Sequence, residues 1–547
     1  MDLNKLNANS KGIAMKNPSH THIAAAFVAA LLAACGGGSN TETPEPITTP
    51  IPTSTRGQLI QSPPSTVVSL SAPFLTGLLQ ANGAAGQGLL QLGGTPVCGV
   101  DVKYMQFKTV GGKGEATTAS GALMLPTGTA PVCTGPRPII LYAHGTALDK
   151  SYNIANLVAP ANPAYLEAVE IAALYVAQGY IVVATNYVGY DSSDAAYHPY
   201  LIADQQSKDM IDALTAARTA LPLLSGTKVT DNGKLFITGY SQGGFVAMAT
   251  HRAMQAAGMA VTASSPGSGF YPMAAFQDFI FSGHPSGPFL EAMMIMGYQN
   301  SYGNIYNAPT DIYTNSFANV GSALAANLNY TSLAQTGAAP PYAVFSKTPP
   351  TPELASLTPA MTGTSADALF AFSFGDPSLI TNAYRLAYLQ DMQAHPDGLN
   401  PITLLGMPTS TAANPLRKAA VLNDLRGFAP NAPVLLCGGT DDPTVLFATH
   451  TSVMKAQWAA TPPPAPTFVL DISSQQLAAN DGFNALRMGY QSGKTATYTV
   501  AYNAAISGGQ SVAAATAAAS AAVLSSTHIA IAPFCAVAAR GFFSKFQ

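Results

Sequence analysis

The strongest chemical signal in the sequence is the segment 239–243, which reads Gly-Tyr-Ser-Gln-Gly. An apolar strand is predicted before it and a helix after it, so the serine would sit at a sharp strand-to-helix turn. Side chains at Gly239 and Gly243 would collide with neighbouring backbone in such a turn. Because the turn lifts the Ser241 hydroxyl out of the sheet at a helix N-terminus, the pattern predicts a nucleophile. A turn without a catalytic role is the alternative.

A serine that attacks a carbonyl needs backbone N–H groups to hold the negative charge that develops on oxygen. One of them is predicted to be the amide of Gln242, the residue after the nucleophile. The second is expected at the end of an early strand, where residues 142–146 read Tyr-Ala-His-Gly-Thr. We favour the amide of Thr146, with Gly145 as the alternative, and we interpret His144 as structural.

A serine hydroxyl is a weak nucleophile at neutral pH, so it needs a base and a carboxylate that orients the base. In a fold of this kind the expected chain order is serine, acid, histidine. The predicted strand 433–437 ends in a glycine turn that is followed by Asp441 and Asp442. The position of Asp442 and the Pro-Thr-Val after it favour this residue as the acid. We expect Asp441 to cap a helix that begins after Pro443.

His528 is the histidine best placed to act as the base, since it is expected in a loop just before a C-terminal helix at 536–546. A solvent-exposed loop histidine is the alternative interpretation. The distance along the chain from Asp442 is long, so residues 475–525 are predicted to be an insertion, which closure entropy permits. His450, eight residues after Asp442, would lie two turns along a helix and face the wrong way. The other histidines are interpreted as leader, structural or cap residues: His20, His22, His144, His198, His251, His284 and His395.

The elements that must position these groups alternate between apolar strands and helices. Strands are predicted at 100–107, 120–125, 137–143, 180–186, 234–239, 259–263, 433–437 and 466–472. Helices are predicted at 164–178, 205–221 and 242–258. This alternation predicts an α/β fold with a mainly parallel sheet and helices on both faces.

Residues 271–428 interrupt this alternation. They are rich in Tyr, Met, Pro and Asn and predict an inserted helical cap or lid. The predicted organisation is therefore a leader, a tether, the first part of the core, the cap and the second part of the core, at 1–34, 35–56, 57–270, 271–428 and 429–547.

The N-terminus has the features of an export signal. Lysines precede a short apolar run from 23 to 34, which ends in Leu-Ala-Ala before Cys35. This ending resembles the lipobox of bacterial lipoproteins, in which the cysteine is lipidated and becomes the mature N-terminus; an ordinary signal peptide is the alternative. Lipidated Cys35 would hold the protein at a membrane, with the outer membrane favoured, and the Pro/Thr-rich residues 35–56 would form the tether.

The composition and the cysteines indicate which partners, cofactors and disulfides to expect. Only 9% of residues are charged and no basic cluster is interleaved with aromatic residues, which disfavours nucleic acid as a partner. No group of side chains has metal-ligand spacing, so no metal or other cofactor is expected. Four cysteines besides the lipobox cysteine favour disulfides in an exported chain. They allow three pairings, of which we favour Cys98–Cys133, flanking an early hairpin, and Cys437–Cys535, joining two C-terminal segments.

Several segments resemble the lipase-like α/β-hydrolases, which include secretory lipases of the lipase-A type and related bacterial esterases and polyester hydrolases. They are the strand end at 138–146, Asn-Tyr-Val-Gly-Tyr at 186–190, His-Pro-Tyr-Leu at 198–201, the serine segment 239–244 and the acid segment 436–445. The resemblance covers most of 98–268 and 433 onward, but neither insertion. The family often has Asp where this chain has Asn186.

The resemblance implies an α/β-hydrolase fold and carboxylic-ester hydrolysis, with Ser241, Asp442 and His528 as the triad. The predicted function is thus a secreted or surface-anchored esterase or lipase, and polyesters are possible substrates. A cap rich in Met, Phe and Tyr predicts an ester with an apolar acyl or polymer chain as the substrate. Two alternatives remain at this point, a prolyl or aminoacyl peptidase of the same fold and a catalytically silent hydrolase-fold surface protein.

Overall fold

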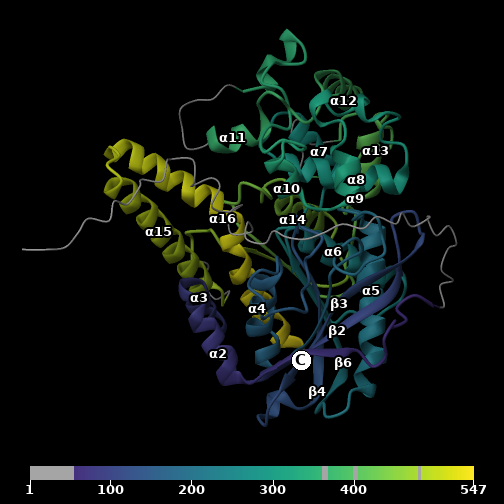
Figure 1. Ribbon diagram of the computed structural model, residues 1–547, viewed down its shortest axis with the longest axis vertical. Helices are drawn as coiled ribbons and strands as arrows, with labels where there is room; N and C mark the ends of the chain where they lie inside the picture. Colours follow the sequence, from purple (N-terminus) through teal and green to yellow (C-terminus); the bar gives the residue numbers. More distant parts are fainter. Residues whose placement is uncertain (1–54, 360–366, 398–404, 478–481) are drawn as a thin grey trace, which may run out of the picture. The chain divides into compact units, whose positions relative to one another are not determined.

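A nine-stranded sheet forms the centre of the computed structural model (Figure 1), in the order β1-β2-β3-β5-β4-β6-β7-β8-β9. The structure describes residues 55–359, 367–397, 405–477 and 482–547. The predicted signal peptide, Cys35 and nearly all of the tether lie outside the described residues.

The strands divide into an antiparallel edge and a parallel majority. The edge comprises β1 (Ser65–Leu70), β2 (Gly99–Val110) and β3 (Ala116–Thr127), and β3 also pairs antiparallel with β5. The parallel strands are β4 (Gly135–Ala143), β5 (Ile181–Thr185), β6 (Val229–Tyr240), β7 (Ala263–Gly267), β8 (Val434–Gly438) and β9 (Thr467–Asp471). Every residue of β5, β7 and β8 is buried, as expected for strands covered on both faces.

Two groups of helices cover the sheet. One group contains α5 (Ala203–Ala220) and α6 (Gln242–Ala256), which pack on each other and on the strands. The other contains α3 (Gly83–Gly93), α4 (Tyr165–Leu174) and α16 (Val512–Phe543), preceded by α2 (Ala72–Ala81). Helix α14 (Thr451–Ala460) lies against β8 and β9. The predicted α/β architecture, a mainly parallel sheet with helices on both faces, is confirmed.

The segment 271–428 contains helices and loops between β7 and β8. Its helices are α7 (Met273–Phe281), α8 (Pro288–Tyr302), α9 (Val320–Ala326), α10 (Tyr330–Gln335), α11 (Asp367–Ser373), α12 (Asn382–Ala394) and α13 (Pro415–Leu422). Arg417 joins three of them, because its guanidinium pairs with Asp278 of α7 at 2.8 Å and Asp391 of α12 at 2.7 Å. These buried ion pairs join α7, α12 and α13 to one another, and Figure 1 shows the segment beyond one end of the sheet.

One predicted strand lies elsewhere in the structure, and three elements were not predicted. The strand expected at 259–263 lies further along the chain, as β7 at Ala263–Gly267. Four of its residues, Ser-Ser-Pro-Gly, are typical of a turn and not of a strand. Their polar groups are satisfied in the sheet, since the Ser265 hydroxyl donates to the carbonyl of Leu435. The first strand, β1, and the helices α2 and α3 were not predicted.

The C-terminal helix is much longer than predicted. It begins at Val512, where the Ser511 hydroxyl accepts from the Ala514 amide, and its Ala-rich first half is a strong helix former. The helix continues through Pro533, and Figure 1 shows that it bends along its length. His528 therefore lies within this helix and not in a loop before it. Helix α15 (Asn484–Ser507) precedes α16 and packs along it, so most of the predicted insertion 475–525 is a helical hairpin.

Candidate active site

Ser241 occupies a strained turn between β6 and α6. Its backbone has φ 60° and ψ −121°, a conformation that non-glycine residues rarely adopt. The turn is possible because the residues two positions before and after the serine are glycines: a Cβ at Gly239 or Gly243 would lie 2.4 or 2.0 Å from the carbonyl oxygen of Ala143. The Ser241 amide donates to the carbonyl of Gly267 on the neighbouring strand β7. This bond holds the residue at the carboxyl end of β6, directly before α6.

A chain of two hydrogen bonds joins three residues far apart in sequence. His528 Nε2 lies 2.9 Å from Ser241 Oγ, and His528 Nδ1 lies 2.7 Å from Asp442 Oδ2. All three side chains are buried. The other carboxylate oxygen of Asp442 accepts from the amides of Thr444 and Val445, which fixes the acid in place. The structure thus brings together the serine, the histidine and the acid that the sequence singled out.

The neighbouring carboxylate has a different role from the one predicted. Asp441 pairs with Lys494 of α15 at 2.5 Å, and it caps no helix. The residues after Pro443 are described in full, and no helix begins there before Thr451. In place of the expected helix start there is a short turn, in which the Asp442 side chain accepts from the amides of Thr444 and Val445.

Two backbone amides are the candidate donors for an oxyanion, those of Gln242 and Thr146. Gln242 begins α6, and its buried side chain is held by His198, whose Nε2 is 3.0 Å from Gln242 Nε2. At the end of β4, the Gly145 amide donates to Glu167 Oε1 at 3.0 Å, so this amide is not free for another acceptor. The Thr146 amide makes no hydrogen bond with any residue in the described part of the chain. The geometry therefore favours Thr146 over Gly145 as a second donor.

The chain resembles known hydrolases in both sequence and structure. Residues 168–279, from α4 to α7, match the prolyl oligopeptidase family, a match that includes Ser241 but ends before Asp442 and His528. No curated protein matches the sequence. A ligand-bound structure of the rice cell wall degrading esterase LipA from Xanthomonas oryzae is 23% identical, with a TM-score of 0.60, over 90% of this chain and 100% of that chain.

Another crystal structure of that esterase is 25% identical, with a TM-score of 0.56, over 79% of this chain and 95% of that chain. The structure of lipase A from Candida antarctica is 14% identical, with a TM-score of 0.43, over 76% of each chain. In fold, this chain is an α/β-hydrolase. The order of the strands and the position of Ser241 after β6 agree with the fold class expected from the sequence.

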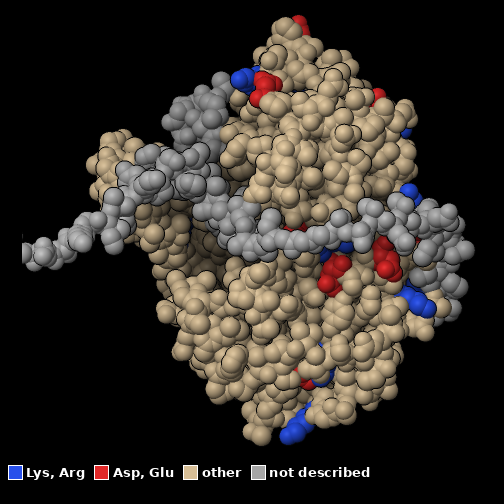
Figure 2. Space-filling view, viewed as in Figure 1, with Lys and Arg blue, Asp and Glu red and all other residues tan. Residues whose placement is uncertain are grey.

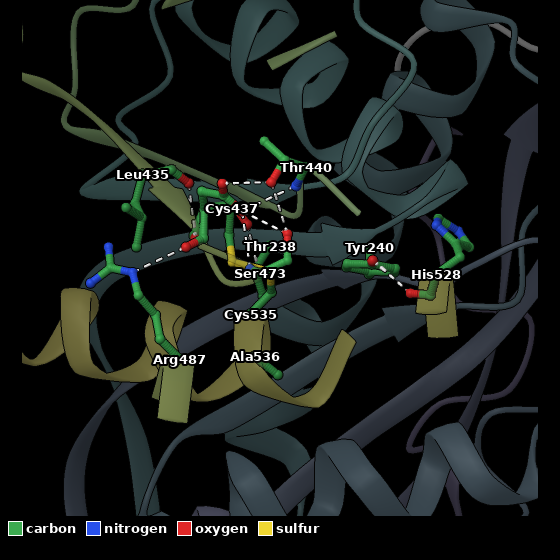
Figure 3. Close-up of a disulfide and its surroundings, with 12 residues drawn as sticks. Thr238, Tyr240, Leu435, Cys437, Thr440, Ser473, Arg487, His528, Cys535 and Ala536 are labelled. Carbon is green, nitrogen blue, oxygen red and sulfur yellow. Dashed lines mark hydrogen bonds between the residues drawn. A yellow bond between two sulfur atoms is a disulfide. The ribbon is translucent and has the colours of Figure 1, made fainter. Parts of the chain in front are cut away.

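Both disulfides of the α/β-hydrolase pair as predicted, Cys98 with Cys133 and Cys437 with Cys535. Cys535 lies seven residues after His528, about two helical turns, so both side chains leave the same face of α16. Its partner lies on β8, the strand that leads to the acid loop (Figure 3). The Tyr240 hydroxyl also anchors this helix by donating to the carbonyl of His528 at 2.7 Å. The base is therefore fixed to the sheet both covalently and by a hydrogen bond.

Replacing Cys437 and Cys535 with serine is expected to lower the free energy of unfolding of the hydrolase by up to about 5 kcal/mol. The bond closes a segment of 98 residues, and loop-closure entropy in the unfolded chain grows with the length of that segment. Equilibrium urea denaturation measures the change. The matched variant lacks the Cys98–Cys133 bond, which closes only 35 residues, and should lose up to about 4 kcal/mol. A larger loss for the shorter loop would contradict this account.

Glu167 is a site residue that the sequence did not indicate. It lies in the first turn of α4, and its carboxylate accepts from the hydroxyls of Tyr142 and Tyr152 as well as from the Gly145 amide. These three bonds hold the loop whose next amide is that of Thr146. Nothing in the sequence separates Glu167 from any other glutamate near a helix start, so only the fold reveals it.

The Glu167→Gln variant of the hydrolase is expected to have a kcat about tenfold lower, because it would displace the loop that carries the Thr146 amide. Removing an oxyanion donor altogether costs about 10²-fold or more in kcat, so displacing one should cost less. In the native protein the hydroxyls of Tyr142 and Tyr152 donate to the Glu167 carboxylate. The glutamine side chain would instead direct an N–H donor at one of these hydroxyls. As a positioning residue, Glu167 should affect kcat and the binding of a boronic acid analogue in parallel, with little change in KM.

Glu170→Gln is the matched control for that variant. Burial and the Glu167 carboxylate raise the pKa of Glu170 to about 8, so Glu170 is largely protonated at neutral pH and glutamine imitates it. Its activity should match that of the unmodified hydrolase. Equal losses in both variants would show that α4, and not the Glu167 carboxylate, is responsible.

The remaining histidines near the site have structural contacts. His144 is buried between the rings of Tyr152 and Tyr187, and burial lowers its pKa. Burial also lowers the pKa of His198 to about 3, and its Nδ1 bonds to the carbonyl of Val188. Both rings are therefore neutral at neutral pH. In the hydrolase they fix the loops around Ser241.

Proposed function

We propose that the α/β-hydrolase is a serine carboxylic-ester hydrolase, an esterase or lipase that uses a Ser-His-Asp triad. The observation that carries this proposal is the continuous hydrogen-bonded chain from Ser241 Oγ through His528 to Asp442 Oδ2. A histidine hydrogen-bonded on both sides in this way can take a proton from the serine while the carboxylate stabilises the imidazolium that results.

The proposed reaction has two halves. His528 Nε2 accepts the Ser241 proton while Oγ bonds to the ester carbonyl carbon, and the carbonyl oxygen becomes an oxyanion between the amides of Gln242 and Thr146. The carbonyl then re-forms, the C–O bond to the alcohol breaks, and His528 protonates the leaving oxygen. Water, deprotonated by His528, attacks the acyl-enzyme in the same manner and releases the acid and Ser241.

The proposed substrate is an ester with an apolar acyl or polymer chain. Aliphatic and aromatic side chains dominate the helices of 271–428 that pack over the sheet, among them Met293, Met294, Met296 and Phe281. The similar LipA structures belong to an esterase described as degrading rice cell walls, which supports an ester in polymeric material, polyesters included.

We propose that the protein acts outside the cytoplasm, held at the cell envelope through lipidated Cys35. Two disulfides support an oxidising compartment. Metabolic labelling of cells with a radioactive fatty acid tests the anchor: the protein should become labelled, and Cys35→Ser should remove the label.

The ester proposal is tested with purified protein on nitrophenyl esters of short and long acyl chains, then on polyester emulsions. We expect turnover on esters and none on prolyl or aminoacyl nitroanilides. The match of residues 168–279 to the prolyl oligopeptidase family favours a peptidase as the second candidate. Cleavage of anilides without cleavage of esters would select it, and failure of a fluorophosphonate to label Ser241 would reject both.

A further inference from the structure

The hairpin of α15 and α16 is tied to the rest of the chain mainly at its base. Near the start of α15, Arg487 and Gln491 donate to the carbonyls of Asp471 and Ser473, and Lys494 pairs with Asp441. Beyond these residues the two helices pack along each other (Figure 1). The outer part of the hairpin therefore presents most of its surface to its surroundings.

This outer part has no charged residue. From position 495 to position 539 the sequence contains no Asp, Glu, Lys or Arg. Small buried alanines lie within the hairpin: Ala505, Ala515 and Ala519. Aliphatic side chains instead point outward on both sides of the turn 507–511: Val500 is 70% exposed, Ile506 38% and Val512 65%. We call these three residues the hairpin tip. The part of the hairpin visible in Figure 2 likewise shows no blue or red side chain.

Helix α16 is long and apolar enough to cross a membrane, and it is the helix of the described residues that meets this test. Its second half, however, belongs to the core. Ile531, Cys535 and Phe542 are buried, and Cys535 is bonded to strand β8. Drawing α16 into a bilayer would remove His528 from Ser241. The apolar tip is therefore suited to touching a surface and not to spanning one.

The chemistry of the tip selects the kind of surface. Helices that lie among phospholipid headgroups use Lys and Arg on their polar face and often Trp at the boundary. The outer hairpin has neither, since its residues carry no positive charge and the single Trp of the chain is Trp458 of α14. An uncharged aliphatic surface matches it better, because burying the tip there leaves no charge without a partner.

We propose that the hairpin tip docks the protein onto the surface of a water-insoluble aliphatic ester, such as a triacylglycerol droplet. This inference rests on the proposed function. The same helix leads from Val512 at the tip to His528 at the site, about 24 Å at 1.5 Å per residue. Ile529, next to the base, is also 55% exposed, so apolar surface continues toward the site. A droplet bound at the tip would therefore lie on the side of the molecule where α16 leads to His528 and Ser241.

The test compares a tip variant, V500Q/I506Q/V512Q, with a matched control, I60Q/L223Q/L422Q, whose three aliphatic residues are also exposed but lie elsewhere. Glutamine is polar, uncharged and compatible with helices. Binding to a triolein emulsion is measured by flotation in the Ser241→Ala background, so that the droplets are not consumed. Circular dichroism and Tm establish that each variant is folded.

The tip variant should bind triolein at least about tenfold more weakly, since one fully buried aliphatic side chain is worth that much in partitioning. The control should bind as the parent does. With Ser241 restored, hydrolysis of dissolved nitrophenyl acetate should stay within about twofold of the parent rate in both, because a dissolved ester needs no docking surface.

Equal binding by the tip variant and the parent would overturn the proposal. The proposal would also be overturned if the tip substitutions weakened binding to phosphatidylcholine vesicles and not to triolein, which would assign the tip to a membrane. It would likewise be overturned if the parent were a dimer that the tip substitutions convert to a monomer. Absence of ester turnover in the parent would instead reject the proposed function. The two failures are therefore distinguishable.

Discussion

The Ser241→Ala variant is expected to lose about 10⁴- to 10⁶-fold in kcat on nitrophenyl esters, because no other group can form the acyl-enzyme. The hydroxyl lies 2.9 Å from His528 Nε2, at the sharp turn between β6 and α6. The remaining activity over the rate in water would come from the oxyanion donors and substrate binding. Stopped assays at high enzyme concentration, with loss of fluorophosphonate labelling, measure this effect.

Ser268→Ala is the matched control for that variant. Ser268 is also buried, also has a positive φ, and follows the neighbouring strand β7, but it does not contact His528. Its variant should keep labelling and lose less than about tenfold in kcat, as expected for a residue outside the reacting groups. If Ser241→Ala retained activity close to that of Ser268→Ala, the nucleophile would lie elsewhere.

The Asp442→Asn variant is expected to lower kcat by about 10⁴-fold, the effect of replacing the orienting acid of a serine triad. The asparagine side-chain oxygen can still accept hydrogen bonds from the amides of Thr444 and Val445. It cannot stabilise the imidazolium, and its amide group favours the wrong tautomer of His528. KM should change little, because Asp442 is 1% exposed and contacts His528 on the side away from Ser241.

Asp441→Asn separates the two adjacent carboxylates. Asp441 pairs with Lys494 and about a third of its side chain is exposed, so the loss of this ion pair costs little. Its kcat should stay within about threefold of the parent value. The reverse pattern, with a severe loss for Asp441→Asn, would show that the catalytic carboxylate had been assigned to the wrong residue.

Much of the core could be predicted because its parallel strands are buried on both faces and therefore read as short apolar runs. Strand β4 at 135–143 and strand β8 at 434–438 are examples, and both lie where their apolar residues indicate. The turn at Ser241 could also be predicted, because only glycine fits at positions 239 and 243 without a collision with the neighbouring backbone. Strand β7 was misplaced because its polar residues are satisfied only by partners on other strands.

Other features depend on contacts that a local pattern cannot contain. The C-terminal helix was predicted only at 536–546, after Pro533, a residue that usually ends helices, yet α16 runs from Val512 through Pro533 to Phe543, packs against the sheet and is bonded to it at Cys535. Glu167 contacts the site through tertiary hydrogen bonds alone. The role of Asp441 depends on Lys494, which the fold brings from 53 residues away.

The backbone at Ser241 has a consequence for how this protein can evolve. A residue with a side chain costs of order 1–3 kcal/mol at a positive φ, a cost that glycine avoids. Glycine at position 241 would thus give a sturdier fold without a nucleophile. Selection for stability and selection for turnover therefore oppose each other at this one position. Every protein that keeps the serine has a folded state that is less stable than glycine would allow.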